Sequence, residues 1–141
     1  MSERSELRVH GRRLVPLSLD VACVLLFVVA GRDSHDEDGS VADVLTIAAP
    51  FLIGLAVAWL ASPRLRSRPM AIRAGVDAWV SAVAIGMLLR RVVWDRGTAL
   101  SFVIVTALVL GALLLGWRWI WSLAHRRREI RSALPPSKAG R

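Results

Sequence analysis

A run of 21 residues without a single charge, from Gly97 to Trp117, most constrains what this chain can fold into. A helix rises about 1.5 Å per residue, so a run of this length crosses the roughly 30 Å of hydrocarbon in a bilayer. Backbone N–H and C=O groups find no water there, which forces such a segment to be helical. The run therefore predicts a transmembrane helix over residues 99–121.

Three other apolar runs have a similar length. Leu14–Gly31 carries one charge, and the stretch from Val44 to Pro63 carries none. Ala74–Trp94 carries charges only near its two ends. We therefore predict an all-α protein, a four-transmembrane-helix bundle, with spans at about residues 14–31, 42–62, 74–94 and 99–121. Pro50 is expected to kink the second span.

Composition agrees with this fold class. Hydrophobic residues make up 55% of the chain and the mean hydropathy is +0.50, which is too apolar for an ordinary soluble domain. The net charge of +8 stands in blocks between apolar runs, so it indicates membrane topology and no nucleic-acid partner. The first run resembles a secretory signal, but Asp20 within it favours a retained span.

The segments outside the spans are basic. Residues 1–13 form a predicted basic cytoplasmic arm without an apolar period, which we expect to be mostly disordered. Residues 14–121 form the predicted membrane domain. Residues 122–141 form a basic cytoplasmic tail, in which Pro135 and Pro136 block a long continuation of helix.

The distribution of basic residues predicts the orientation. Placing both termini and the loop between the second and third spans in the cytoplasm puts 15 of the 19 basic residues there. This predicts a multi-pass protein of the cytoplasmic (inner) membrane with both termini inside. Five tryptophans fall at the cytoplasmic ends of their spans, where we expect them to act as interfacial anchors: Trp59, Trp79, Trp117, Trp119 and Trp121.

The two halves of the chain resemble each other weakly. A shift of 58 positions aligns Arg32 with Arg90, Gly39 with Gly97, Ser40 with Thr98 and Trp59 with Trp117. These residues mark the same points of a helical hairpin, which favours two tandem hairpins that arose by duplication. The alternative is that any two membrane hairpins look alike, and the sequence leaves both explanations open.

Charged residues within the spans form two predicted layers. Asp20 and Asp77 each lie roughly 5 to 10 Å inside the cytoplasmic edge, and Arg118 reaches the same depth. These three residues are the candidate inner polar cluster. The candidate outer polar cluster lies near the other edge and contains Arg32, Asp43, Arg90 and Arg91.

One face of the third span carries residues at steps of three or four, namely Asp77, Ser81, Ala84, Leu88 and Arg91. This face is predicted to connect the two layers. Each layer has two explanations: an ion-pair girdle that holds four helices in register, or an ion or proton path in which one aspartate changes protonation. The uncharged middle of the span favours the girdle.

Other motifs point to packing more than to chemistry. His35, Asp36 and Glu37 are weak candidates for a metal site, because no second histidine or recognised spacing accompanies them. No phosphate loop, nucleophile elbow or paired cysteines appear, so we predict no enzyme and no cofactor. Small residues at four-residue steps predict close helix contacts: Gly54–Ala58, Ala107–Gly111 and Ala112–Gly116.

Several short stretches occur in a characteristic order: residues 46–54 (TIAAPFLIG) followed by Trp59, then residues 84–90 (AIGMLLR), 102–105 (FVIV) and 116–118 (GWR). In this order they resemble the small prokaryotic membrane proteins grouped as domain of unknown function 3054. The similarity covers roughly residues 17–120. Leu55 stands where the resemblance leads us to expect a tryptophan. The resemblance implies a multi-span integral membrane protein, with no known reaction, ligand or partner.

Two functions fit these features. The first is a non-catalytic membrane module that packs in the lipid bilayer with a second copy of itself or with a membrane protein partner through its small-residue faces. The alternative is a minimal oligomeric transporter or channel for a small solute or ion that uses the intramembrane aspartates and arginines.

Overall fold

The structure is a computed structural model that describes residues 3–32, 40–93 and 99–133. These residues form five helices and no strand: α1 (Glu3–Arg32), α2 (Val41–Ala61), α3 (Pro63–Ser67), α4 (Ile72–Val92) and α5 (Leu100–Ala133). Four of the helices are long and apolar enough to cross a membrane, over Arg13–Gly31, Val41–Ala61, Ile72–Val92 and Leu100–Arg127. The prediction of an all-α membrane protein with four spans is confirmed.

The observed helices differ from the predicted spans mainly at the two ends of the chain. Helix α1 begins at Glu3 and α5 ends at Ala133, so the expectation of an irregular arm and tail is wrong for residues 3–13 and 122–133. Extending an existing helix needs no new nucleation step. The first and the last span therefore continue as helix into the charged sequence beside them. Helix α5 stops just before Leu134, the residue that precedes Pro135 and is disfavoured in a helix for that reason.

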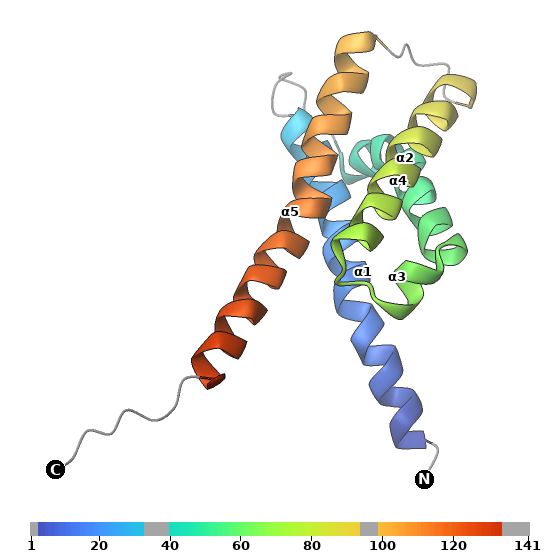
Figure 1. Cartoon of the computed structure of the whole chain (residues 1–141). Helices are drawn as coiled ribbons and strands as arrows, with labels where there is room; N and C mark the ends of the chain where they lie inside the picture. Colours follow the sequence, from blue (N-terminus) through green and yellow to red (C-terminus); the bar gives the residue numbers. More distant parts are fainter. Residues whose placement is uncertain (1–2, 33–39, 94–98, 134–141) are drawn as a thin grey trace, which may run out of the picture.

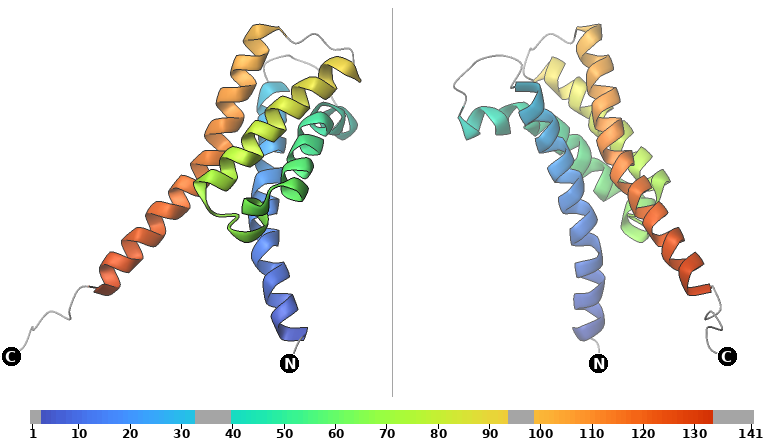
Figure 2. Two further views of the ribbon diagram at one scale, coloured as in Figure 1. Left: turned by 45° about the vertical axis from the view of Figure 1, so that its right-hand side comes forward. Right: turned by 90° about the vertical axis from the view of Figure 1, so that its left-hand side faces the viewer.

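The helices form two antiparallel hairpins, α1 with α2 and α4 with α5 (Figure 1). Helix α2 packs along α4, while α1 closes the bundle by contacting α2 and α5. The start of α1 and the end of α5 project from the same end of the bundle, which also holds α3 (Figure 2). We call this end the basic end, because Arg64, Arg66 and Arg68 lie in and beside α3. The arrangement fits two tandem hairpins, and their origin by duplication stays a prediction.

Helix α2 bends along its length. Its first half (teal) runs at an angle to its second half (green) in both views of Figure 2. Pro50 lies inside the helix and is buried. Proline lacks the N–H of the helical ladder and its ring crowds the preceding turn, so it accounts for the bend.

Close approach of two backbones joins α2 to α4. A Cβ atom added to Gly54 would lie 2.7 Å from the carbonyl oxygen of Ser81 and 2.9 Å from the Cα atom of Ala82. The Ser81 hydroxyl donates to the Gly54 carbonyl oxygen at 2.7 Å. In lipid, helices associate through such packing and hydrogen bonds, because burying apolar side chains gains little there. Gly54 therefore sets the separation of α2 and α4.

Aromatic and aliphatic side chains fill the rest of the bundle. The rings of Phe27 on α1 and Phe51 on α2 meet edge to face, with centroids 5.6 Å apart and planes at 81°. Leu110 and Leu114 contribute buried side chains from α5. The interior is therefore mostly apolar, and the few polar side chains inside it stand out.

We predict that Gly54→Ala destabilises the protein, because its added methyl group meets the backbone of α4. Gly31→Ala is the matched control, since it also replaces a helical glycine and its added carbon meets nothing within 4 Å. We expect a loss of roughly 1–3 kcal/mol for Gly54→Ala and none for the control. Thermal unfolding in detergent micelles, followed by circular dichroism, measures both. Equal midpoints for the two variants would contradict the tight crossing.

Candidate functional site

A buried ion pair between α1 and α5 is the principal polar feature of the described residues. Asp20 and Arg118 are both 0% exposed. Nη1 of Arg118 lies 2.7 Å from Oδ1 of Asp20, and Nη2 lies 2.8 Å from Oδ2. This is the bidentate geometry that suits a guanidinium and a carboxylate. The structure thus brings together two of the three residues of the candidate inner cluster.

Two tryptophans complete the shell of the carboxylate. The indole N–H of Trp117 donates to Oδ1 of Asp20, and that of Trp59 donates to Oδ2, each at 3.1 Å. A carboxylate has about four lone-pair sites. Asp20 therefore receives four donors from within the chain, and both of its oxygens are fully occupied.

Arg118 is held by further contacts. Its Nε–H donates to the carbonyl oxygen of Pro69 at 3.0 Å, and Nη1 also donates to that of Leu114 at 2.8 Å. The Trp117 ring lies 4.3 Å from the guanidinium carbon, within the range of a cation–π contact. Gly75 on α4 makes room for the side chain, because a Cβ there would lie 2.7 Å from Cδ of Arg118.

Asp77, the third residue of the candidate inner cluster, lies elsewhere. Its Oδ2 accepts from the Ser62 hydroxyl at 2.6 Å, and Arg64 approaches both of its carboxylate oxygens at 3.3 Å. Asp77 is 25% and Arg64 65% exposed, so this second ion pair is a surface feature. The predicted three-residue cluster is wrong in this respect. The rotation of α4 turns Asp77 toward α3 instead of toward Arg118.

The same rotation corrects the predicted polar face of α4. The residues packed inside the bundle are Ala74, Gly75, Ala78, Ala82 and Gly86. Ala84, Leu88 and Arg91 are exposed, with Leu88 at 61%. The face that was expected to connect two polar layers therefore turns outward along its second half. Small residues occupy the inner face because α2 approaches α4 so closely.

The residues of the candidate outer cluster lie near the ends of three helices, α1, α2 and α4. Asp43 forms a capping box with Ser40 at the start of α2, accepting from the Ser40 N–H at 2.9 Å. The guanidinium carbon of Arg90 lies 4.4 Å from the centroid of the Phe102 ring. Arg91 is exposed. Arg32 is the last residue of α1, and its side chain lies outside the described residues.

The predicted interfacial role of the tryptophans is incomplete. Trp59 and Trp117 donate to Asp20, while Trp79 donates to the carbonyl oxygen of Ala107 at 2.8 Å. A Cβ on Gly111 would lie 3.1 Å from the Trp79 indole nitrogen, so the Ala107–Gly111 step seats this ring. Three of the rings therefore serve hydrogen bonding inside the bundle.

The weak metal candidates are not tested. His35, Asp36 and Glu37 lie outside the described residues. Within residues 3–32, 40–93 and 99–133, no group of three or more histidine, cysteine, aspartate or glutamate side chains is arranged to hold a metal ion.

Comparison with known protein families assigns the chain. The family described as "Protein of unknown function (DUF3054)" matches residues 17–121. The chain belongs to this family. The matched segment begins three residues before Asp20 and ends three residues after Arg118, so the DUF3054 region contains the whole ion pair. No curated protein and no solved structure matches the chain.

Sequence reasoning missed the partners of these charges. It placed Trp59 and Trp117 at the membrane interface and did not connect either ring with Asp20. The 58-residue shift that aligns these two rings was the available signal, because equivalent positions in two hairpins reach equivalent depths. No sequence pattern marked the Pro69 carbonyl or the Ser62 hydroxyl as a hydrogen-bond partner, since loop geometry brings these two groups to Arg118 and Asp77.

We predict that Asp20→Asn and Asp77→Asn differ sharply in stability, although each removes one negative charge. Asp20→Asn leaves Arg118 buried without a counterion, which costs about 3–5 kcal/mol. Asp77→Asn affects an exposed pair and one hydroxyl contact, so we expect a loss of at most about 1 kcal/mol. Unfolding in mixed micelles of rising SDS content, followed by circular dichroism, measures both. Similar losses would contradict the assignment of the buried pair.

We also predict that Trp117→Phe costs roughly 1.5–3 kcal/mol, because it removes a hydrogen bond to a charged acceptor. Trp119→Phe is the matched control on the same helix, since Trp119 is 58% exposed. We expect the control to change the free energy of unfolding by less than about 0.5 kcal/mol. The same SDS titration compares the two. An unchanged midpoint for Trp117→Phe would show that the indole N–H contributes nothing to Asp20.

Proposed function

We propose that this DUF3054 protein is a non-catalytic helical module of the cytoplasmic membrane that associates with a second copy of itself. The observation that carries the proposal is the closed ion pair. Asp20 and Arg118 neutralise each other in an ion pair, and both oxygens of Asp20 accept hydrogen bonds from donors of the same chain. The charge therefore serves to hold helices together.

The alternative function, a minimal transporter, makes a different demand on the same residues. A proton- or ion-coupled site needs a carboxylate that changes its protonation or its ligands during each cycle. Asp20 offers no lone pair to a solute unless the pair with Arg118 opens. Breaking a buried pair of this kind costs several kcal/mol, which favours a structural role.

The outward face of α5 supports self-association. Ile104, Leu108 and Ala112 are exposed at steps of four residues, and Gly116 continues the same row. A Cβ on Gly116 would meet nothing within 4 Å, so this glycine serves no close contact inside the chain. Small residues at a four-residue step allow two membrane helices to approach closely. The other two predicted steps, at Gly54 and Gly111, are already used within the bundle.

The proposed orientation places the basic end in the cytoplasm. The start of α1, the end of α5 and the whole of α3 lie at that end of the bundle (Figure 1). With the basic end inside, 15 of the 19 basic residues are cytoplasmic. The positive-inside rule favours this arrangement.

We predict that replacing Ala112 and Gly116 together by leucine shifts the protein from dimer to monomer in lipid vesicles, because the larger side chains hold the two α5 helices apart. Single-molecule photobleaching of labelled protein at several protein-to-lipid ratios measures the dimer fraction. Ala56→Leu with Ala84→Leu is the matched control, since both alanines are exposed on other helices. A wild-type protein that stays monomeric at every ratio would contradict self-association.

Flux measurements distinguish the module from the transporter. Proteoliposomes that hold a pH or ion gradient report transport through the change in a dye inside the vesicles. The module is expected to give the same leak as vesicles without protein. A gradient-driven flux that Asp77→Asn abolishes, while the thermal midpoint of that variant stays unchanged, would replace the proposal with the transporter.

A further inference from the structure

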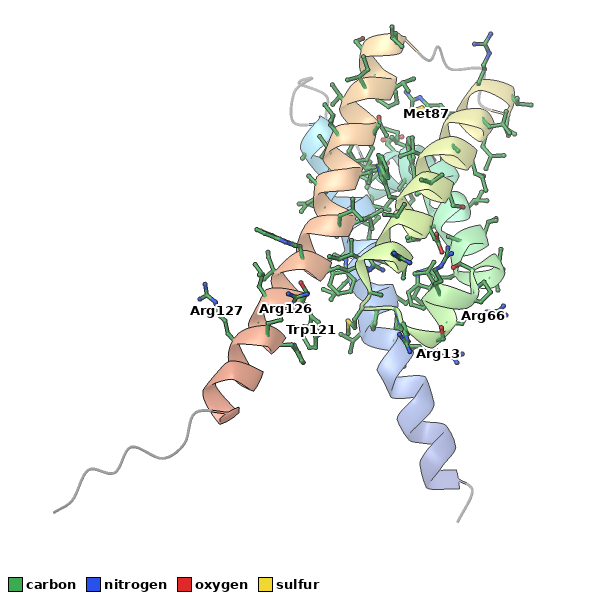
Figure 3. The ribbon with its side chains drawn as sticks, viewed as in Figure 1. Arg13, Arg66, Met87, Trp121, Arg126 and Arg127 are labelled. Atoms are coloured by element: carbon green, nitrogen blue, oxygen red, sulfur yellow. The ribbon has the colours of Figure 1, made fainter. Side chains whose placement is uncertain are left out.

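A pocket of about 820 Å³ lies at the basic end, and neither Asp20 nor Arg118 is among its lining residues. Its walls come from α1 at Arg13, from α3 and the α3–α4 connection, which includes Arg68, and from α5 at Trp121. Figure 3 shows Arg13 on α1, Arg66 on α3 and Trp121 on α5 at about the same level, whereas Arg127 points away from the bundle. Three separate parts of the chain therefore contribute to one pocket.

The charge of the pocket is positive. Three arginines line it, Arg13, Arg66 and Arg68, together with His125. No carboxylate is among its lining residues within the described parts of the chain. The carboxylate of Asp77 is engaged by Ser62 and Arg64. Guanidinium groups bind phosphate oxygens in a bidentate manner, so the pocket suits a phosphate-bearing ligand.

The surface of α1 that continues from the pocket along the membrane-spanning residues is apolar. Val15 lines the pocket, and Leu19 lies one helical turn further along the same face of α1. Their exposed fractions are 55% and 39%, and both belong to the membrane-spanning part of α1. A ligand bound here thus finds cations at one end and a strip of exposed aliphatic side chains at the other. This combination matches the headgroup and acyl chain of a lipid.

Trp121, a lining residue of the pocket, is a residue type suited to the headgroup region of a bilayer. Its ring is 42% exposed and lies against that of His125, with centroids 4.5 Å apart and planes at 32°. Tryptophan favours the headgroup region of a bilayer, because its ring is apolar and its N–H is polar. This preference of Trp121 favours a position of the pocket at the level of the lipid headgroups.

The buried ion pair fixes one wall of this pocket. The carbonyl oxygen of Pro69, a lining residue, accepts from Nε of Arg118 at 3.0 Å. Leu65 anchors α3 with a fully buried side chain, and Ser62 caps that helix while donating to Asp77. The segment that presents Arg66 and Arg68 is thus held at both of its ends.

We propose that this pocket binds the headgroup of an anionic phospholipid, with the phosphate between the three arginines and an acyl chain along Val15 and Leu19. A zwitterionic headgroup is a poorer ligand, because its ammonium group would lie among guanidinium groups without a carboxylate to receive it. Phosphatidylglycerol should therefore be preferred over phosphatidylcholine.

Competition between the two lipids tests this proposal on the full chain in detergent. Native mass spectrometry of protein incubated with equal amounts of phosphatidylglycerol and phosphatidylcholine gives the ratio of bound lipids. We expect the wild type to prefer phosphatidylglycerol. The triple variant Arg13→Gln, Arg66→Gln, Arg68→Gln should lose about fivefold of that preference for each arginine removed, and so roughly a hundredfold in all.

The matched control removes the same charge from the same end of the bundle. Arg73, Arg126 and Arg127 are exposed and outside the pocket lining, so their triple glutamine variant should keep the wild-type preference. Added phosphatidylglycerol should raise the thermal midpoint of the wild type and of this control, but not that of the pocket variant. If the control lost as much of the phosphatidylglycerol preference as the pocket variant, the preference would come from general attraction between the basic end and anionic lipid. That result would overturn the proposal.

Two further outcomes would also overturn the proposal. One is equal binding of the two lipids by the wild type. The other is displacement of phosphatidylglycerol by inorganic phosphate at the same concentration, which would show a site for free phosphate without a contribution from the acyl chain.

Discussion

Removal of two opposite charges from water, inside a bundle that is mostly apolar, is the constraint on which this structure depends. The desolvation of Asp20 and Arg118 is offset only if each charge meets the other with good geometry and their remaining hydrogen bonds are made. Trp59, Trp117 and the Pro69 carbonyl supply those bonds. Because the partners come from α1, α2, α5 and the α3–α4 connection, satisfying one ion pair fixes the relative positions of nearly every element.

Helix α4 takes part in this arrangement through residues without large side chains. Gly75 leaves space for the stem of Arg118, and Gly86 receives the ring of Phe51. Ala82 lies against Gly54 of α2. Dispersion contacts and hydrogen bonds carry helix association in lipid, so close backbone approach replaces the burial of bulky apolar groups. The hydrogen bonds around the ion pair and the close packing of α4 therefore stabilise the same four helices.

Several charges that the ion pair does not use lie at the periphery of the bundle. Asp77 and Arg64 form a partly exposed pair, and Arg91 is exposed at the opposite end. The arginines of the α3–α4 connection surround the basic pocket. The interior thus holds helices together, whereas the proposed contacts with lipid and with another copy involve the outer surface. This division is the physical basis for the module proposed for this DUF3054 protein.

The sequence by itself determined the four helices and the position of each charge along its helix, because hydrocarbon forces the backbone into helix and each residue advances by a fixed rise. That was enough to place Asp20, Asp77 and Arg118 at one level. It was not enough to choose their partners, since the rotation of each helix about its axis depends on packing with its neighbours. Only the tertiary structure turned Asp77 toward α3 and brought Trp59 and Trp117 to Asp20, because close packing of small residues fixes α4 in one orientation.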